Sequence, residues 1–166
     1  MEGQLTDQPD IHLAGVSFFG DPFSAHAGWT EENEIGRLWQ RFFRLREILK
    51  ETAPKALSRR MYEVHLIGDE FLETGEYEVF LGYEITSREM VPPLMLRKSL
   101  PGGRRALFTV KGESIADMDC YASMQNWLEQ QGLQREGGWT YNLYDDRFLG
   151  MDRLSESVLD VVIPVR

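Results

Sequence analysis

Aromatic and polar side chains best suited to hold an organic ligand gather in one short run, GGWTYNLYDDRF. In an extended strand, Trp139 and Tyr141 point to one face, whereas Asn142 and Tyr144 point to the other. Aromatic faces bind flat or cationic molecules, and an amide can both donate and accept hydrogen bonds. The spacing predicts a strand that lines a polar-tipped pocket. A strand with one solvated face has the same pattern.

Three residues outside this run are further candidates. Trp39 falls beside the apolar stripe of an expected helix, so it either packs in the core or forms one wall of a pocket. Glu84 follows Tyr83, a further aromatic candidate, in the strand-like segment LGYEI. On an exposed face Glu84 would be solvated, whereas a position facing a cleft would make it a partner for a cation or a general base.

Motifs of the common enzyme classes are missing from the sequence. It has no G-x-S-x-G, H-E-x-x-H or C-x-x-C pattern and no phosphate-binding glycine loop. The single cysteine, Cys120, cannot form an internal disulfide, and its place in an amphipathic segment favours packing. His12, His26 and His65 lack the paired spacing of metal ligands. We therefore expect no metal site and no cofactor.

Composition limits the class of partner. The chain has 166 residues, of which 42% are hydrophobic, as expected for one compact domain over 1–166. Its 27 acidic and 18 basic residues give a net charge of -9, which repels phosphate backbones, so we expect no direct nucleic-acid binding. We interpret the one basic cluster as a solvated surface, because it lacks interleaved aromatics. It consists of Arg97, Lys98, Arg104 and Arg105.

The N-terminus and the hydropathy predict location. The first ten residues have neither a basic segment nor an apolar one, and no run of about 18 apolar residues occurs. We expect no signal peptide, no membrane span and a cytoplasmic protein. The sequence leaves the oligomeric state open.

The first half of the chain has the order strand, helix, strand, strand. The helix is expected to begin at Thr30 as N-cap, with Trp29 as a hydrophobic staple, and to end before Pro54. The turn-rich connection before it would be either a lid or a surface loop without function. Gly75 suits a hairpin between the second and third strands. The expected strands cover 11–20, 61–69 and 77–85.

The second half repeats this order. Ser114 and Asp117 resemble a capping box that opens a helix, and Gly132 would end it. The octets LAGVSFFG and RALFTVKG, which begin at Leu13 and Arg105, both end in glycine just before the helix connection. Two such units could pack pseudo-symmetrically around a ligand cleft. The expected strands cover 104–113, 139–146 and 158–165, and PLMLRKSL could add an edge strand.

The order of these segments resembles the GyrI-like small-molecule-binding family, the effector-binding module of bacterial transcription activators. The resemblance runs from about Ile11 to Val165, and the residues before Ile11 are too few for a helix-turn-helix domain, so we expect a stand-alone member. It implies an α+β fold with an antiparallel sheet, two pseudo-symmetric repeats over about 11–90 and 94–166, and a cleft for hydrophobic, often cationic, aromatic compounds. The segments that carry it are IGRLWQRF, YEVFLGYEI, ALFTVKG, NWLEQQG, YNLYDDRF and LDVVIPV.

One position departs from the pattern that the resemblance implies. The family's penultimate strand carries aromatic-Glu-x-Tyr-Asp, with the glutamate facing the cleft and pairing with the ligand's positive charge. Here the glutamate position is Asn142. An amide contributes hydrogen bonds of about 0.5 to 1.5 kcal/mol net each, whereas a buried carboxylate attracts a desolvated cation strongly. We therefore expect neutral or polar aromatic ligands, unless Glu84 or another acid supplies the charge.

Three functions remain open at this point. The leading hypothesis is a protein that sequesters or senses planar hydrophobic xenobiotics. The resemblance also extends to hydrolases that open cyclopropane rings of DNA-alkylating compounds, in which case Trp39, Trp139 and Tyr144 would form the cage and Glu84 or Asn142 would position water. The third is an acidic module that inhibits a protein partner. The candidate ligand-binding residues are Trp39, Tyr83, Trp139, Tyr141, Asn142 and Tyr144, and the candidate catalytic residue is Glu84.

Overall fold

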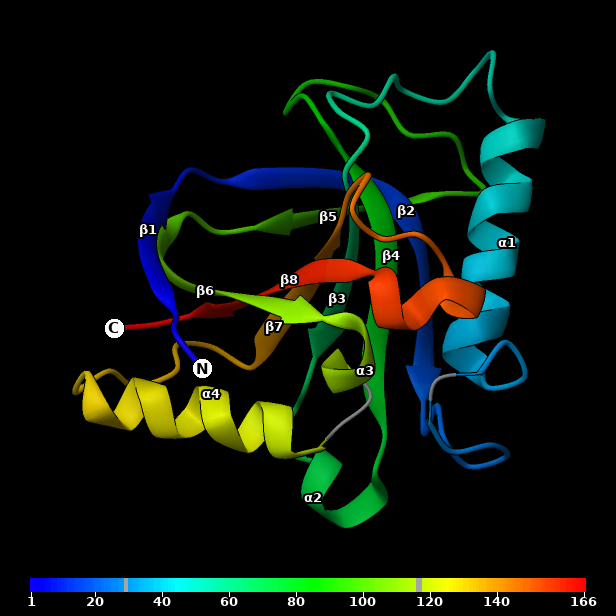
Figure 1. Ribbon diagram of the computed structural model, residues 1–166. Coiled ribbons are helices and arrows are strands. Elements are labelled where there is room, and N and C mark those ends of the chain that lie inside the picture. Colours follow the sequence, from blue (N-terminus) through cyan, green and yellow to red (C-terminus); the bar gives the residue numbers. More distant parts are fainter. Residues whose placement is uncertain (29, 116–117) are drawn as a thin grey trace.

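The structure, a computed structural model, describes residues 1–28, 30–115 and 118–166, so the expected roles of Trp29 and Asp117 lie outside the described residues. Within these residues, the strands form an eight-stranded antiparallel sheet in the order β1-β6-β8-β7-β3-β4-β2-β5 (Figure 1). The strands are β1 (Gln4–Gln8), β2 (Ile11–Gly20), β3 (Met61–Leu66), β4 (Tyr77–Ile85), β5 (Leu96–Leu100), β6 (Gly103–Lys111), β7 (Trp139–Tyr144) and β8 (Val158–Pro164). The helices are α1 (Glu34–Ile48), α2 (Phe71–Thr74), α3 (Gly112–Ile115), α4 (Met118–Gln130) and the 3-10 helix η1 (Met151–Glu156).

On either side of the central β7–β3 pair, the strands of the two repeats follow in the same order: β8 matches β4, β6 matches β2, and β1 matches β5. This symmetry confirms the expected α+β fold of two pseudo-symmetric repeats. Repeat one is β2-α1-β3-β4, and repeat two is β6-α3-α4-β7-β8. The strand that precedes each repeat pairs with a strand of the opposite repeat. β1, which precedes repeat one, pairs with β6 of repeat two, and β5, which precedes repeat two, pairs with β2 of repeat one. The expected edge strand, β5, is therefore present. The strand β1, QLTDQ, was not expected; it is polar, and in the structure it is mostly exposed.

One row of paired residues crosses the six central strands and marks the pseudo-two-fold axis. Its two innermost members, Glu63 of β3 and Asn142 of β7, are direct partners across that axis. The expected octet alignment agrees with this row, since Val16 and Phe108 are each the fourth residue of their octet. The full row is Val16, Leu81, Glu63, Asn142, Val161 and Phe108.

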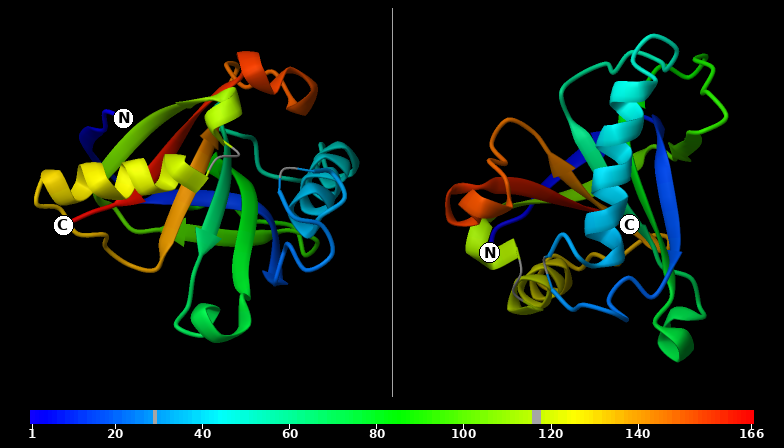
Figure 2. Two further views of the ribbon diagram at one scale, coloured as in Figure 1. Left: turned by 60° about the horizontal axis from the view of Figure 1, so that its bottom comes forward. Right: turned by 90° about the vertical axis from the view of Figure 1, so that its right-hand side faces the viewer.

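The two long helices cover the sheet face on which Glu63 and Asn142 lie. Helix α1 packs on β2 and β4 of repeat one, and α4 packs on β6 and β8 of repeat two (Figure 2). Trp39 and Met61 contact both of these cores, so the two repeats meet at the axis. On the opposite face, side chains of β5 and β2 pack with side chains of β7 and β8, which means that the sheet curls around a further core.

The start of α1 differs from the expected one. The N-cap is Asn33, not Thr30, because the Asn33 side chain accepts a hydrogen bond from the Gly36 N–H at 2.9 Å. The Asn33 amide also donates to the Gly28 carbonyl at 2.7 Å. Thr30 instead accepts from the Glu32 N–H at 3.2 Å and so closes a turn ahead of the helix. The polar run 30–34 offers several capping residues, and the hydrogen bonds of Asn33 with Gly36 and Gly28 place the cap at Asn33.

The remaining connections follow the expected turn chemistry. Gly75 adopts a left-handed φ of 75° at the end of α2, and β3 and β4 pair as an antiparallel hairpin. Gly132 has a φ of 66° just after α4, where a side chain would be strained. The short helix α2 inside the hairpin connection was not expected.

Candidate functional site

A buried carboxylate, Glu63 of β3, occupies the centre of the helix-covered face. Only 4% of Glu63 is exposed. Its sequence neighbours Tyr62 and Val64 point to the opposite face, so this face of β3 carries Met61, Glu63 and His65. A buried ionised group destabilises the fold unless it is hydrogen-bonded, so its partners decide whether it carries charge.

Side chains from α1, β3 and β7 donate to this carboxylate. Oε2 accepts from Trp39 Nε1 at 2.7 Å and from the Tyr144 hydroxyl at 3.2 Å. Oε1 lies 2.9 Å from His65 Nε2 and 3.3 Å from the Asn142 amide nitrogen. The strand register explains this convergence, because Asn142 is the direct partner of Glu63, and Tyr144 and His65 lie two residues away on the same face. We call these five residues the Glu63 cluster.

Electrostatics keep the carboxylate ionised. Burial alone would raise the pKa of the Glu63 carboxyl. The hydrogen bond and electrostatic attraction of His65, followed by the hydrogen bonds from Trp39 and Tyr144, outweigh burial and hold this pKa below its ordinary value. Burial, with the Glu63 charge second, raises the pKa of Tyr144 well above its ordinary value. The Glu63 carboxylate is therefore ionised, beside the His65 ring and a neutral phenol.

Aromatic rings lie within and beside the cluster. Trp39 meets Tyr144 edge-on, with ring centroids 5.1 Å apart. His65 stacks on Tyr77 of β4 at 5.7 Å, and Tyr144 meets Phe148 edge-on at 4.9 Å. The arrangement combines a negative charge with ring faces and edges, which suits a hydrophobic molecule that carries positive charge.

Three of the expected site residues meet in this cluster: Trp39, Asn142 and Tyr144. Tyr83 lies on the same face but under α1, where its hydroxyl donates to the Pro54 carbonyl at 2.8 Å. The Arg46 guanidinium lies 5.0 Å from the centre of the Tyr83 ring. These contacts give Tyr83 a role in anchoring the end of α1 against the sheet.

The other expected residues lie on the opposite face of the sheet. Trp139 stacks on Tyr141 at 6.2 Å, as the alternation of strand side chains requires. Glu84 accepts a hydrogen bond from the Tyr62 hydroxyl at 3.1 Å on that face. The expected cage of Trp39, Trp139 and Tyr144 is therefore not assembled, and Glu84 is not beside it. The sheet itself separates them.

The basic cluster also needs a correction, because it is not a uniformly solvated surface. Only 1% of Arg105 is exposed. Its guanidinium lies 4.8 Å from the centre of the Trp139 ring and donates to the Pro101 carbonyl. Lys98 of β5 forms an ion pair with Glu78 at 2.7 Å. Strand alternation turned these side chains inward, which the run of charges did not reveal.

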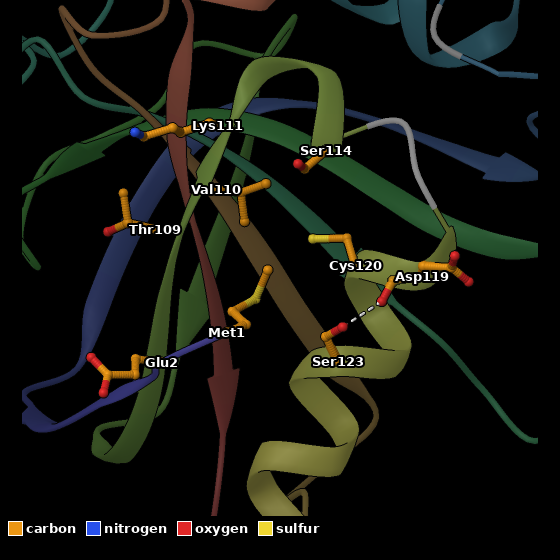
Figure 3. A pocket seen from close by; sticks show the side chains of 9 residues that line it. All are labelled: Met1, Glu2, Thr109, Val110, Lys111, Ser114, Asp119, Cys120 and Ser123. Atoms are coloured by element: carbon orange, nitrogen blue, oxygen red, sulfur yellow. Dashed lines mark hydrogen bonds between the residues drawn. The ribbon is translucent and has the colours of Figure 1, made fainter.

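A surface hollow lies away from the Glu63 cluster. Its volume is about 500 Å³, and it opens between β6, the N-terminal residues and the start of α4 (Figure 3). Within α4, which forms one side of the hollow, the Ser123 hydroxyl donates to the Asp119 carbonyl at 2.8 Å. The hollow is lined by Met1, Glu2, Thr109, Val110, Lys111, Ser114, Asp119, Cys120 and Ser123. At the axis, Glu63, Asn142 and Tyr144 are buried and contact one another.

Over 1–28, 30–115 and 118–166, no three His, Cys, Asp or Glu side chains are grouped so that they could hold a metal ion. Among the helices described, none has the length and apolar character needed to cross a bilayer.

Sequence reasoning missed Glu63, although the repeat contains a signal for it. Aligning the two repeats on their central strands matches Tyr62-Glu63-Val64 with Tyr141-Asn142-Leu143, since Glu63 and Asn142 are equivalent across the axis. Applied to the repeat, this alignment carries the candidate position Asn142 over to Glu63.

Comparisons with known proteins agree with this fold. The family model Cass2, described as integron-associated effector binding protein, matches residues 4–165. The transcriptional regulator BrlR of Pseudomonas aeruginosa is 26% identical over 168 residues, and the match covers 99% of this chain but 56% of that regulator. The chain thus spans little more than half of that relative.

Solved structures of low sequence identity share the fold. The structure of SAV2435 bound to tetraphenylphosphonium matches with a TM-score of 0.69 and 15% identity, over 100% of this chain and 94% of that one. The EcmrR C-terminal domain matches with a TM-score of 0.71 and 14% identity, over 99% of this chain and 97% of that one.

Proposed function

The chain belongs to the Cass2 family of integron-associated effector-binding proteins, and from this premise we propose that it binds hydrophobic organic cations against the Glu63 carboxylate. Family membership makes it an effector-binding domain, which suggests a small-molecule ligand and agrees with the expected GyrI-like resemblance. The observation that carries the proposal is the buried, ionised carboxylate among aromatic side chains. Hydrophobic compounds with a positive charge complement both features.

A cation gains more from this site than a neutral ligand does. Inside a protein the attraction between a carboxylate and a desolvated cation is much stronger than in water. Trp39 and Tyr144 add ring surface next to the charge. The expectation of neutral or polar ligands at Asn142 applied only if no other acid supplied the charge. Glu63, which faces Asn142, is such an acid and supports the proposal of a cationic ligand.

Ligand entry requires one donor to leave the carboxylate. Trp39 is the candidate, since it comes from α1 and is only half-buried, whereas Asn142 and Tyr144 are buried in the sheet. A cation that took the place of the Trp39 N–H would restore the lost stabilisation of Glu63. The displaced indole would then form a wall of the ligand site.

The proposal favours binding over hydrolysis. The expected hydrolase used a cage that included Trp139 and water positioned by Glu84, and both residues lie across the sheet from Glu63. SAV2435 is described with tetraphenylphosphonium, a hydrophobic cation, and that compound is a suitable first probe for this chain. We propose that binding serves sequestration or sensing of such compounds.

The test is a pair of titrations on matched carboxylate variants. Wild-type protein, Glu63→Gln and the control Glu84→Gln are titrated with tetraphenylphosphonium and with neutral triphenylphosphine oxide, by calorimetry. We expect Glu63→Gln to lose about 10- to 100-fold in affinity for the cation, equal to about 1.4 to 2.8 kcal/mol. Glu84→Gln should bind the cation as wild type does, and the neutral compound should not distinguish the variants.

Equal cation affinity in wild type and Glu63→Gln would contradict the proposal. Circular dichroism of both variants establishes that they are folded. Mass spectrometry of the released compounds, extended to a cyclopropane-bearing ligand, tests the hydrolase alternative, because a water-added product would make the chain an enzyme.

A further inference from the structure

His65 is the one basic side chain that contacts the Glu63 carboxylate among the described residues. Its Nε2 lies 2.9 Å from Glu63 Oε1, and its ring stacks on Tyr77 at 5.7 Å. The His65 side chain is 18% exposed and that of Glu63 is 5% exposed. The pair therefore sits at the edge of the buried cluster, where a proton can reach the imidazole from solvent while the carboxylate stays enclosed.

The surrounding groups leave His65 as the switchable one. Phenols do not change charge between pH 5 and 8, because their ordinary pKa is about 10. Burial and the Glu63 charge raise the pKa values of Tyr77 and Tyr144 further. Histidine is the side-chain type that titrates in this range. In the described part of the chain, other titratable groups also face the pair of His65 and Glu63 on β3. They are Tyr77 of β4, Tyr121 of α4 and Tyr144 of β7. Two more distant charges act electrostatically on these phenols: Asp21 on Tyr77, and Arg135 on Tyr121.

We propose that His65 selects the charge class of the ligand. A protonated His65 is an internal cation that already neutralises Glu63, so the site then accepts neutral compounds and rejects organic cations. A neutral His65 does not neutralise Glu63, so the carboxylate can pair with a cationic ligand. This inference rests on the proposed function, because it assumes that ligands bind against Glu63.

The competition is strong because the two cations would share one carboxylate. Two unit charges about 5 Å apart, at an effective dielectric constant of about 20, repel enough to weaken binding by more than about 100-fold. A fixed-charge ligand must therefore displace the proton from His65 before it binds. By linkage, cation affinity rises with pH by up to about tenfold per unit while His65 is protonated, and then becomes constant.

The first experiment uses the wild-type chain. Tetraphenylphosphonium keeps its charge at every pH, so its dissociation constant is measured by calorimetry from about pH 5.5 to 8.5, a range that spans histidine titration. Measurements in buffers of different ionisation enthalpy give the protons released on binding. We expect tighter binding at higher pH and the release of up to one proton at low pH. Triphenylphosphine oxide should bind without this pH dependence.

Histidine variants assign the effect to one ring. His65→Gln keeps a side-chain N–H donor but cannot be protonated, so it should bind the cation with nearly constant affinity over the whole range. The matched control is His12→Gln, which removes a histidine whose Nδ1 lies 2.9 Å from the Ser99 hydroxyl in the β2–β5 pair. The control should keep the pH dependence of wild type.

Should His65→Gln fail to fold, histidine-ring NMR of the wild type replaces it: tetraphenylphosphonium should lower the titration midpoint of one of the three rings. Tight cation binding that is independent of pH, or that keeps its pH dependence in His65→Gln, overturns the role of His65 and leaves the proposed function standing. Failure of the cation to bind at any pH overturns both.

Discussion

The two repeats share one architecture but contribute different chemistry at their common axis. Repeat one supplies the carboxylate of Glu63 and its neighbour His65, whereas repeat two supplies the amide of Asn142 and the hydroxyl of Tyr144. Two carboxylates in direct register would repel each other and share a proton. A pseudo-symmetric sheet can therefore hold one buried negative charge at the axis, and either strand of the β3–β7 pair can carry it.

This difference explains the departure at Asn142. The GyrI-like resemblance placed an acid on the penultimate strand, and here that position holds an amide whose nitrogen lies 3.3 Å from the Glu63 carboxylate. The negative charge is still at the axis, carried by the equivalent position of repeat one. An amide opposite a carboxylate can donate to it, which a second acid in its ionised form cannot do.

Asn142→Glu should have the largest effect, because it makes the two repeats alike. The two carboxylates would face each other in a buried site, and we expect a loss of about 3 kcal/mol in the free energy of unfolding at pH 8. At pH 5 the loss should be smaller, since one carboxyl of the pair is then protonated more easily. Urea unfolding at both pH values measures this.

The control for Asn142→Glu is Asn126→Glu, which adds the same charge at an exposed position of α4. It should change stability little at either pH. An equal loss for Asn142→Glu at pH 8 and pH 5 would mean that the two carboxylates do not interact.

Exchanging the two residues should reverse most of that loss. The double variant Glu63→Asn, Asn142→Glu moves the acid to repeat two and restores one carboxylate opposite one amide. We expect it to recover about 2 kcal/mol relative to Asn142→Glu alone and to bind tetraphenylphosphonium. A double variant no more stable than the single one would show that the axis does not tolerate the exchange.

Trp39→Phe should cost less, because it removes one donor from repeat one. Losing the 2.7 Å hydrogen bond to a charged group should lower the free energy of unfolding by about 1.5 to 3 kcal/mol near neutral pH. Trp127→Phe on α4 is the control: its ring packs edge-on against Phe108 at 5.3 Å. Urea unfolding of both variants at pH 7 and pH 3 should show that the cost of Trp39→Phe alone shrinks in acid.

The smallest effect concerns the acid limb of stability. The pKa of Glu63 is lower in the folded chain than its ordinary value, so its contribution is present above that ordinary value and is lost as pH falls through the folded pKa. Between about pH 5 and 3, wild type should therefore lose about 1 kcal/mol more than Glu63→Gln does. Parallel slopes for the two proteins in this range would contradict the depressed pKa.

Local pattern was enough to predict most of the fold. The octets from Leu13 and Arg105 predicted β2 and β6, the apolar stripe predicted α1, and Gly75 and Gly132 predicted turns that the structure confirms. Side-chain alternation correctly separated Trp139 and Tyr141 from Asn142 and Tyr144. These features repeat every two or three to four residues, so a short stretch of chain is sufficient to reveal them.

Long-range packing decided the rest. Glu63 became the central residue because the register of β3 against β7 places it opposite Asn142, and because α1 brings Trp39 to the same carboxylate. The short-range periodicity of side chains along a strand does not determine which strand it pairs with or how a helix crosses the sheet. For the same reason the pairing of β1 with β6 could not be read from QLTDQ: its hydrogen-bonding partner lies about a hundred residues away, at Leu107 opposite Gln4.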